Sequence, residues 1–321
     1  MFKSPAGPIA VVVAGLLLLV GCAYSPSELD GKSFGMPAEQ LEIERGLIGV
    51  VSNQGDDHQR TPLKQPQAQH NGRSASVAVY SDGSLHWASA YGEAKNTDTL
   101  FQAASLSKAV AAVGIAALAL EVGMDLDTDL TDSFDVLQDD RVNPAGVRVT
   151  LRSLLSHSSG ATISGFPGYS PDGPVPSTLD IALGTNGSNT PGITIDPARA
   201  GQRKYSGGGI HLAQLWAETV SGESFPSLMK RLVLDPVGME RSTFDLIRPE
   251  DERSTNLAPG YGEEGLPAGG GWLLYPQGAA AGLRPTPPEY VRFISALISS
   301  FTDVQDRGIH PDVGREVLAP A

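Results

Sequence analysis

The sequence has one cysteine and a shortage of positive charge. Cys22 allows no disulfide within the chain and no zinc site built from cysteines. Lys and Arg total 23 against 36 Asp and Glu, a formal net charge of −13, so the excess positive charge that nucleic-acid binding requires is missing. The six histidines form no H-x-x-x-H pair, and no phosphate-binding or dinucleotide-binding Gly motif follows a predicted strand. We therefore expect no nucleic-acid partner, no metal and no cofactor.

The N-terminus lacks a run long enough to cross a membrane. The apolar segment from Ile9 to Val20 is shorter than the span of about 20 residues that a bilayer requires. With Lys3 before it and Leu19-Val20-Gly21-Cys22 after it, it resembles the lipobox of a bacterial lipoprotein signal. The resemblance implies cleavage before Cys22 and a lipid on its thiol. An ordinary signal peptide or a short anchor helix is the alternative.

This interpretation divides the chain into three parts. We expect a lipoprotein signal peptide at 1–21, a tether and irregular lead-in at 22–70, and one domain at 71–321. The tether begins with a polar stretch rich in Ser, Gly and Pro. The expected localisation is the cell envelope, with the protein anchored by lipid to a membrane and facing the periplasm or the exterior.

The remaining sequence is typical of a folded domain with few strands and many helices. Hydrophobic residues make up 40% and charged residues 18%. Asp82-Gly83 between two β-rich runs predicts a hairpin, and the nearly all-apolar segment 105–122 predicts a buried helix. Further helices are predicted at 151–155, with Thr150 as its N-cap, and at 179–183, 210–220 and 225–233. A capping box formed by Thr286 and Glu289 predicts another helix at 286–298. The order of these elements indicates an α/β (α+β) fold.

Ser105 and Lys108 form an S-x-x-K motif at the start of the predicted buried helix. Residues at i and i+3 share a helix face, and a partly desolvated lysine can act as a base. The helix N-terminus stabilises developing negative charge near the serine oxygen. This combination is typical of an activated serine nucleophile. A second S-x-x-K, Ser227 to Lys230, is followed by Arg231, and we interpret it as an ordinary amphipathic helix with an exposed lysine.

Tyr205 is a second candidate for proton transfer. It follows Arg203 and Lys204 directly. Neighbouring positive charge can lower the pKa of a tyrosine, and the phenolate can then accept a proton from a serine.

Five landmarks in the expected order resemble the serine β-lactamase-like superfamily, in the branch of class C β-lactamases, D-Ala-D-Ala carboxypeptidases and related esterases. They are DTLFQAASLSK (98–108), LLSHSSG (154–160), YSGGG (205–209), VLDPVGMERST (233–243) and AAGL (280–283). The resemblance covers the chain from about Ala75 to its end. It implies a β-lactamase/transpeptidase-like fold with an antiparallel sheet and a large helical region.

The resemblance also assigns roles. It implies that Ser105 is the acylated nucleophile, Lys108 the base or proton relay, and Tyr205 the tyrosine of the family's Tyr-x-Asn motif. Gly207 stands at the Asn position of that motif, in the substrate-binding region, as in esterase-like members, which speaks against a β-lactam substrate. The backbone N–H of Ser105 would be one oxyanion donor, and His157 is expected to be structural, capping a turn.

The family's third motif, K-[ST]-G or H-x-G on a later strand, has no counterpart in the correct order. We therefore expect a domain that is incomplete at its C-terminus and lacks its last sheet strands. Two hypotheses remain open at this point. One is an envelope serine hydrolase that acts through a Ser acyl-enzyme on an ester, an amide or a D-amino-acid peptide. The other is a truncated, catalytically incompetent lipoprotein with a binding role or none.

Overall fold

A computed structural model describes residues 74–318 apart from the segments 82–83, 92–93, 262–270 and 303–306. The predicted signal peptide at 1–21, the predicted lipidation site Cys22 and the predicted tether at 22–70 lie outside the described residues. So does the Asp82-Gly83 turn of the predicted hairpin.

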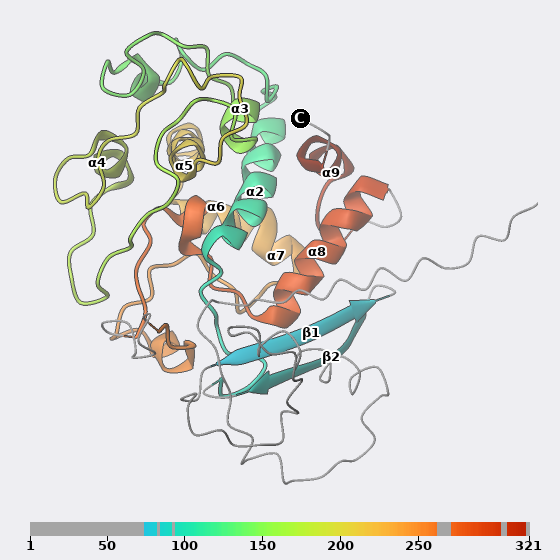
Figure 1. Ribbon diagram of the computed structural model, residues 1–321. Helices are drawn as coiled ribbons and strands as arrows, with labels where there is room; N and C mark the ends of the chain where they lie inside the picture. Colours follow the sequence, from blue (N-terminus) through green and yellow to red (C-terminus); the bar gives the residue numbers. More distant parts are fainter. Residues whose placement is uncertain (1–73, 82–83, 92–93, 262–270, 303–306, 319–321) are drawn as a thin grey trace, which may run out of the picture.

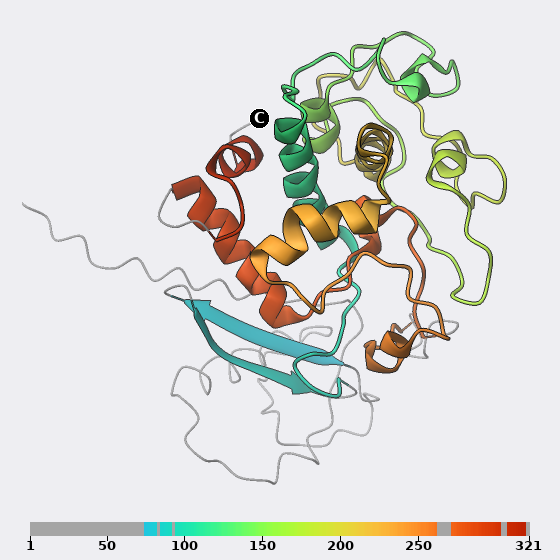
Figure 2. The ribbon, with the colours of Figure 1, turned by 180° about the vertical axis from the view of Figure 1, so that it is seen from behind.

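The first described elements are the two strands of the predicted hairpin. β1 (Ala75–Ser81) and β2 (Ser84–Tyr91) pair antiparallel, with Val77 opposite Ser89. Within the part of the chain that the structure describes, they form a two-stranded sheet. Figures 1 and 2 show the hairpin lying beneath the helical part, with helix α8 (Pro287–Thr302) packed against β1. The predicted hairpin is confirmed.

Helix α2 (Ser107–Glu121) passes through the centre of the helical part, preceded by a 3₁₀ turn, η1 (Ala104–Leu106). Its side chains are buried on several faces, because helix α5 (Gly207–Ser221), helix α9 (Pro311–Leu318) and the π-helical turn η5 (Gly278–Gly282) all contact it. Among the described residues, Ala104–Glu121 is the segment long and apolar enough to cross a membrane, but half of it is buried inside the protein. It is therefore a core helix, as the sequence predicts.

The sequence did not predict α9, but the helices that it did predict are among the remaining described helices. These remaining helices are α3 (Leu151–Leu155), α4 (Thr178–Leu183), α5 (Gly207–Ser221), α6 (Phe225–Met229), α7 (Asp235–Val237), α8 and α9 (Pro311–Leu318). The predicted N-cap of α3 is confirmed: the Ser153 backbone N–H donates to the Thr150 hydroxyl at 3.1 Å. The 3₁₀ turns η2 (Asp135–Gln138) and η4 (Glu252–Asn256) lie in connections.

Two details differ from the sequence prediction. The helix expected over 225–233 is broken up, because α6 continues as a π-helical turn, η3 (Lys230–Leu234), before α7. At the start of α8, the Thr286 hydroxyl accepts from the Glu289 N–H at 3.4 Å. In a capping box the Glu289 carboxylate would accept from the Thr286 backbone N–H. Here it accepts hydrogen bonds from the backbone N–H groups of Arg241 and Ser242 instead. The buried glutamate therefore ties α8 to the segment after α7.

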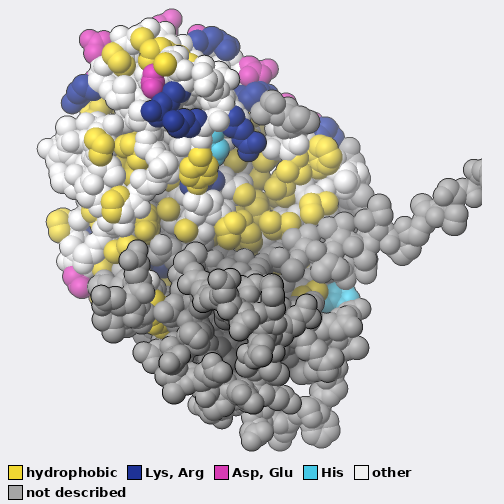
Figure 3. All heavy atoms as spheres, viewed as in Figure 1, with side chains coloured by type: hydrophobic (Ala, Val, Ile, Leu, Met, Phe, Trp, Pro, Cys, Tyr) yellow, Lys and Arg dark blue, Asp and Glu magenta, His cyan; other side chains and the backbone are white. Residues whose placement is uncertain are grey.

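A small antiparallel sheet and a large helical part thus make up an α/β (α+β) fold, as expected. The core lies between α2, α5 and α8. Figure 3 shows hydrophobic side chains gathered over α8 on one face, where Ile298 and Phe301 are exposed. A second π-helical turn, η5 (Gly278–Gly282), lies against α2 and reaches the candidate site.

Candidate active site

Ser105 lies in η1, directly before α2, and its side chain is exposed. The preceding residue, Ala104, has φ +45°, a conformation that costs a non-glycine residue about 1–3 kcal/mol. The N–H of Ala103 donates to the Leu283 carbonyl at 3.0 Å, which anchors this turn to the chain after η5. The strained turn therefore presents Ser105 at the surface on a fixed support.

Lys108 and Tyr205 both contact the Ser105 hydroxyl oxygen. Lys108, partly buried in the first turn of α2, donates from Nζ to Ser105 Oγ at 3.1 Å. The Tyr205 hydroxyl donates to the same oxygen at 2.7 Å. Lys108 Nζ also lies 5.0 Å from the centre of the Tyr205 ring. The structure therefore brings the three residues that the sequence selected into one hydrogen-bonded cluster.

Lys108 has a third partner that sequence reasoning missed. Its Nζ donates to the Ala280 carbonyl at 2.7 Å. η5 is held in place because the Leu283 N–H donates to the buried Ser107 hydroxyl at 3.0 Å. The AAGL landmark at 280–283 was visible in the sequence, but no residue pattern indicates that one of its carbonyls would fix the lysine.

The pKa of Tyr205 is lowered by groups other than those that the sequence indicated. Burial alone would raise the pKa of Tyr205, but its interactions with Lys108 and Ser105 outweigh burial and hold that pKa below its ordinary value. The lowered pKa was predicted, but from the adjacent Arg203 and Lys204, and this cause was wrong. Both side chains are exposed to solvent, whereas Lys108 faces the ring.

Tyr205 is held by the start of α5. Ser206 caps that helix, since its hydroxyl accepts from the Gly209 N–H at 2.8 Å and donates to the Thr162 carbonyl at 3.1 Å. His157, in the turn after α3, lies on the other side, with its ring 4.7 Å from the Tyr205 ring. We expected His157 only to cap a turn; it also contacts the candidate site.

Gly207 is the first residue of α5 and is buried. A Cβ atom built there would lie 3.1 Å from the Ser164 carbonyl oxygen and 3.2 Å from the Phe166 ring. The position is thus enclosed by the neighbouring loop, and a side chain there would require that loop to move. Its assignment to substrate binding stays a prediction.

The lysine of the second S-x-x-K motif is exposed, as predicted. The Lys230 side chain is 64% exposed and pairs with Asp235, and the Ser227 hydroxyl accepts a hydrogen bond from Ser224 rather than from Lys230.

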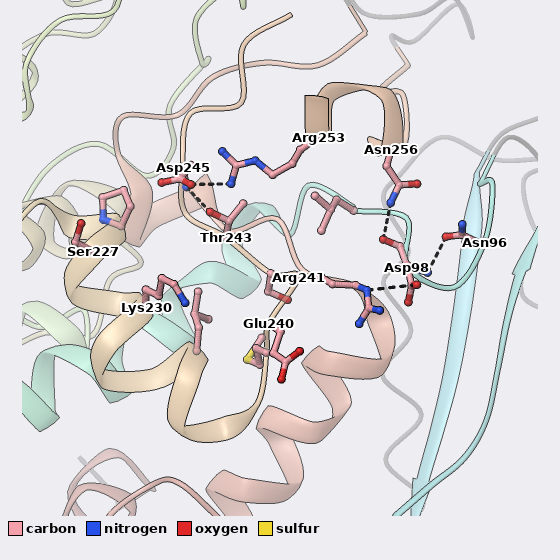
Figure 4. A pocket seen from close by; sticks show the side chains of 15 residues that line it. Asn96, Asp98, Ser227, Lys230, Glu240, Arg241, Thr243, Asp245, Arg253 and Asn256 are labelled. Atoms are coloured by element: carbon pink, nitrogen blue, oxygen red, sulfur yellow. Dashed lines mark hydrogen bonds and ion pairs between the residues drawn. The ribbon is translucent and has the colours of Figure 1, made fainter. Parts of the chain in front are cut away.

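Ser227 and Lys230 line a pocket of about 530 Å³ that does not include Ser105, Lys108 or Tyr205. Figure 4 shows two ion pairs among its charged side chains. Arg241 lies 3.3 Å from Asp98, and Arg253 lies 2.7 Å from Asp245. Within each of these two pairs the opposite charges neutralise each other, and the pocket is separate from the Ser105 cluster.

No group of three potential ligands within the described residues is arranged to hold a metal. In the acidic loop between α2 and α3, Asp127 pairs with Arg152 at 2.9 Å and Asp129 pairs with Arg148 at 3.6 Å. These aspartates act as surface ion-pair partners.

Comparison with known proteins agrees with the fold. A family model described as beta-lactamase matches residues 60–315. A search of curated proteins found no match.

Among solved structures, D-amino acid amidase from Ochrobactrum anthropi is 20% identical with a TM-score of 0.61, over 87% of this chain and 73% of that chain. A class C beta-lactamase from Rhodobacter sphaeroides is 23% identical with a TM-score of 0.56, over 78% and 66% of the two chains. The octameric penicillin-binding protein homologue from Pyrococcus abyssi is 24% identical with a TM-score of 0.57, over 76% and 55%. These likenesses establish the fold. The family match, which extends over most of the sequence and contains the whole Ser105 cluster, places the chain in the β-lactamase family.

Proposed function

We propose that this chain is a serine hydrolase that forms an acyl-enzyme on Ser105. The observation that carries the proposal is the position of Ser105 Oγ, which lies 3.1 Å from the Lys108 ammonium and 2.7 Å from the Tyr205 hydroxyl. A nucleophile with a proton acceptor and a cation within hydrogen-bond distance meets the geometric requirement for nucleophilic catalysis.

The cluster supports a balanced acyl-transfer sequence. The phenolate of Tyr205 accepts the Ser105 hydroxyl proton while Oγ bonds to the substrate carbonyl carbon, whose oxygen becomes negative. When the tetrahedral species collapses, the bond to the leaving group breaks and Tyr205 returns the proton to that group. Water then attacks the acyl-enzyme by the same route and releases the acid.

Lys108 has two tasks in this sequence. Its positive charge, next to the Tyr205 ring, favours the phenolate. Its hydrogen bond to the Ala280 carbonyl fixes the ammonium against η5, so that the charge stays beside the reacting oxygen atoms.

The substrate we propose is an ester, an amide or a D-amino-acid peptide. One structural neighbour is a D-amino acid amidase and another a class C beta-lactamase. Gly207 supplies no side-chain amide to contact a substrate carbonyl, which favours the ester and amide substrates over a β-lactam.

A fluorophosphonate probe tests the proposal. It should label the wild type and fail to label Ser105→Ala. Ser227→Ala is the matched control, because Ser227 belongs to the second S-x-x-K motif and is exposed; this variant should label as the wild type does. Equal labelling of wild type and Ser105→Ala, or none of either, would exclude the nucleophile.

We further propose that Cys22 carries a lipid that anchors the protein to a membrane of the cell envelope. The proposal is based on the lipobox-like sequence that ends at Cys22. Expressed in a bacterial host, the wild type should fractionate with membranes and Cys22→Ser should not. Membrane retention of Cys22→Ser equal to the wild type would contradict the anchor.

A further inference from the structure

His157 contacts the backbone on both sides of Tyr205. Its carbonyl accepts from the Lys204 N–H at 2.8 Å, and its ring Nδ1 accepts from the Ser206 N–H at 3.3 Å. Its ring also lies against the Tyr205 ring, with centroids 4.7 Å apart and planes tilted by 45°. One residue therefore fixes the residue before Tyr205, the residue after it and the aromatic ring itself.

Tyr205 needs such support because the residue is 48% exposed. Apart from His157, the described contacts of its side chain are with Ser105, with which it is proposed to exchange a proton, and with Lys108, which is proposed to stabilise its phenolate. Its orientation is therefore set largely by the backbone around it. α3 lies between α2 and α5 (Figure 1), and its C-terminal turn carries His157 to this point.

The hydrogen bond from the Ser206 N–H requires Nδ1 to be free of a proton. A neutral imidazole with its proton on Nε2 meets this requirement, and an imidazolium does not. The charged or titratable side chains that face the ring are Lys108 from α2 and Arg203 and Tyr205 from the loop before α5. Burial, followed by the positive charges of Lys108 and Arg203, lowers the pKa of His157 below its ordinary value of 6.5.

We propose that His157 is the positioning residue for Tyr205, that it works only as the neutral imidazole accepting from the Ser206 N–H, and that its protonation in acid releases Tyr205 from Ser105. The inference rests on the proposed function for its kinetic consequence, but not for its structural one. The neutral ring is present above pH 6.5 and is lost as the pH falls through the lowered pKa.

Two substitutions distinguish the contribution of the hydrogen-bond acceptor Nδ1 of His157 from that of its ring contact with Tyr205. His157 has φ +63°, a conformation that asparagine tolerates well. His157→Asn places an amide oxygen near the Nδ1 position and does not titrate, whereas His157→Phe keeps an aromatic ring and removes the acceptor. His310→Asn, at an exposed histidine before α9, is the matched control.

Ester hydrolysis should distinguish the variants through kcat, with KM little changed. At about pH 8, His157→Asn should keep most of the wild-type kcat, and His157→Phe should lose up to about 10²-fold, the cost of a misplaced catalytic group. Below pH 6.5 the ratio of kcat for His157→Asn to wild type should rise, by up to about tenfold for each pH unit below the pKa of His157. For His310→Asn the ratio should stay constant. A loss in His157→Asn as large as in His157→Phe, or a ratio that does not change with pH, would overturn the proposal.

An NMR measurement tests the same contact without turnover. In protein labelled at tyrosine Cζ with ¹³C, the Tyr205 resonance, assigned by its absence in Tyr205→Phe, should shift in acid with the titration of His157. It should not shift over that range in His157→Asn. If the fluorophosphonate probe fails to label Ser105 but this shift is present, the proposed function fails and the positioning contact stands. If the shift is the same in both proteins, the positioning role is wrong even where Ser105 is labelled.

Discussion

The Tyr205 hydroxyl lies 2.7 Å from Ser105 Oγ, although 100 residues separate the two in the sequence. Tyr205 precedes α5 and Ser105 precedes α2, so the contact forms only when the two helices pack together. Lys108 reaches the same oxygen from the first turn of α2. The site is therefore a product of helix packing, and each of its contacts can be removed singly.

Tyr205→Phe should lower kcat by about 10²–10⁴-fold, because it removes the group proposed to move the proton to and from Ser105. The fold should be unaffected, since the hydroxyl lies at the surface. Steady-state hydrolysis of a chromogenic ester, with thermal unfolding as the check on folding, measures both effects. Tyr169→Phe, which removes a hydroxyl bonded to the Asn189 N–H, serves as the control. If Tyr205→Phe keeps the wild-type kcat, another group moves the proton.

Lys108→Met should raise the pKa of Tyr205 as well as lower kcat. Burial favours the neutral phenol, and the lysine charge is among the interactions that oppose it. The pKa of Tyr205 can be measured by ultraviolet titration. In the variant it is taken from the difference between Lys108→Met and the double variant that also carries Tyr205→Phe. In the wild type it is taken from the difference between the wild type and Tyr205→Phe. Lys230→Met, at the exposed lysine of the second motif, should leave the Tyr205 pKa and kcat as they are. An unchanged Tyr205 pKa in Lys108→Met would show that the lysine does not tune the tyrosine.

His211 should make the protein sensitive to acid. Its ring is fully buried in α5 with Nε2 2.8 Å from the Thr178 carbonyl, and burial lowers its pKa to about 4. The unfolded chain binds the proton first, so the stability contributed by neutral His211 is present above pH 6.5 and is lost as the pH falls toward 4. The loss amounts to about 3 kcal/mol at most.

Urea unfolding between pH 7 and about 4 tests this dependence. His211→Gln is the comparison, because its amide can donate to the Thr178 carbonyl and does not titrate. Its free energy of unfolding should change less with pH than that of the wild type. Parallel pH curves for the two proteins would mean that His211 is not the acid-sensitive group.

Gly207→Asn should destabilise the protein by about 1–3 kcal/mol, the usual cost of overpacking. The new side chain would press on the Ser164 carbonyl and the Phe166 ring. Gly165→Asn is the control, because it introduces the same side chain in the loop that carries Ser164, at a position where a Cβ meets nothing within 4 Å. This variant should be close to neutral. Thermal unfolding of the two variants should therefore differ; equal melting temperatures would show that Gly207 is not enclosed.

The sequence predicted the elements whose signals are local. The hairpin, the buried helix after Ser105 and the Thr150 cap all follow from periodicity, turn residues and capping chemistry, and all are present. Ser105, Lys108 and Tyr205 could be selected because their motifs resemble those of a known family. The β-lactamase family match agrees with that resemblance.

What the sequence did not predict depends on tertiary contacts. Arg203 and Lys204 are neighbours of Tyr205 in the chain, yet the charge that acts on its ring comes from Lys108. Glu289 follows Thr286 at capping-box spacing, but the backbone of the segment after α7 recruits its carboxylate. The contact of His157 with the Ser206 N–H requires a turn with positive φ, which no spacing rule indicates.

The proposed function depends on acylation of Ser105. The most direct measurement is peptide mapping by mass spectrometry of protein mixed with p-nitrophenyl acetate and quenched in acid. The proposed acyl-enzyme on Ser105 predicts an acetyl group on the peptide that contains Ser105, more of it in wild type than in Tyr205→Phe, and none at that position in Ser105→Ala. Hydrolysis of the ester without an acetylated Ser105, or with the acetyl group at the same level on Ser227, would contradict it.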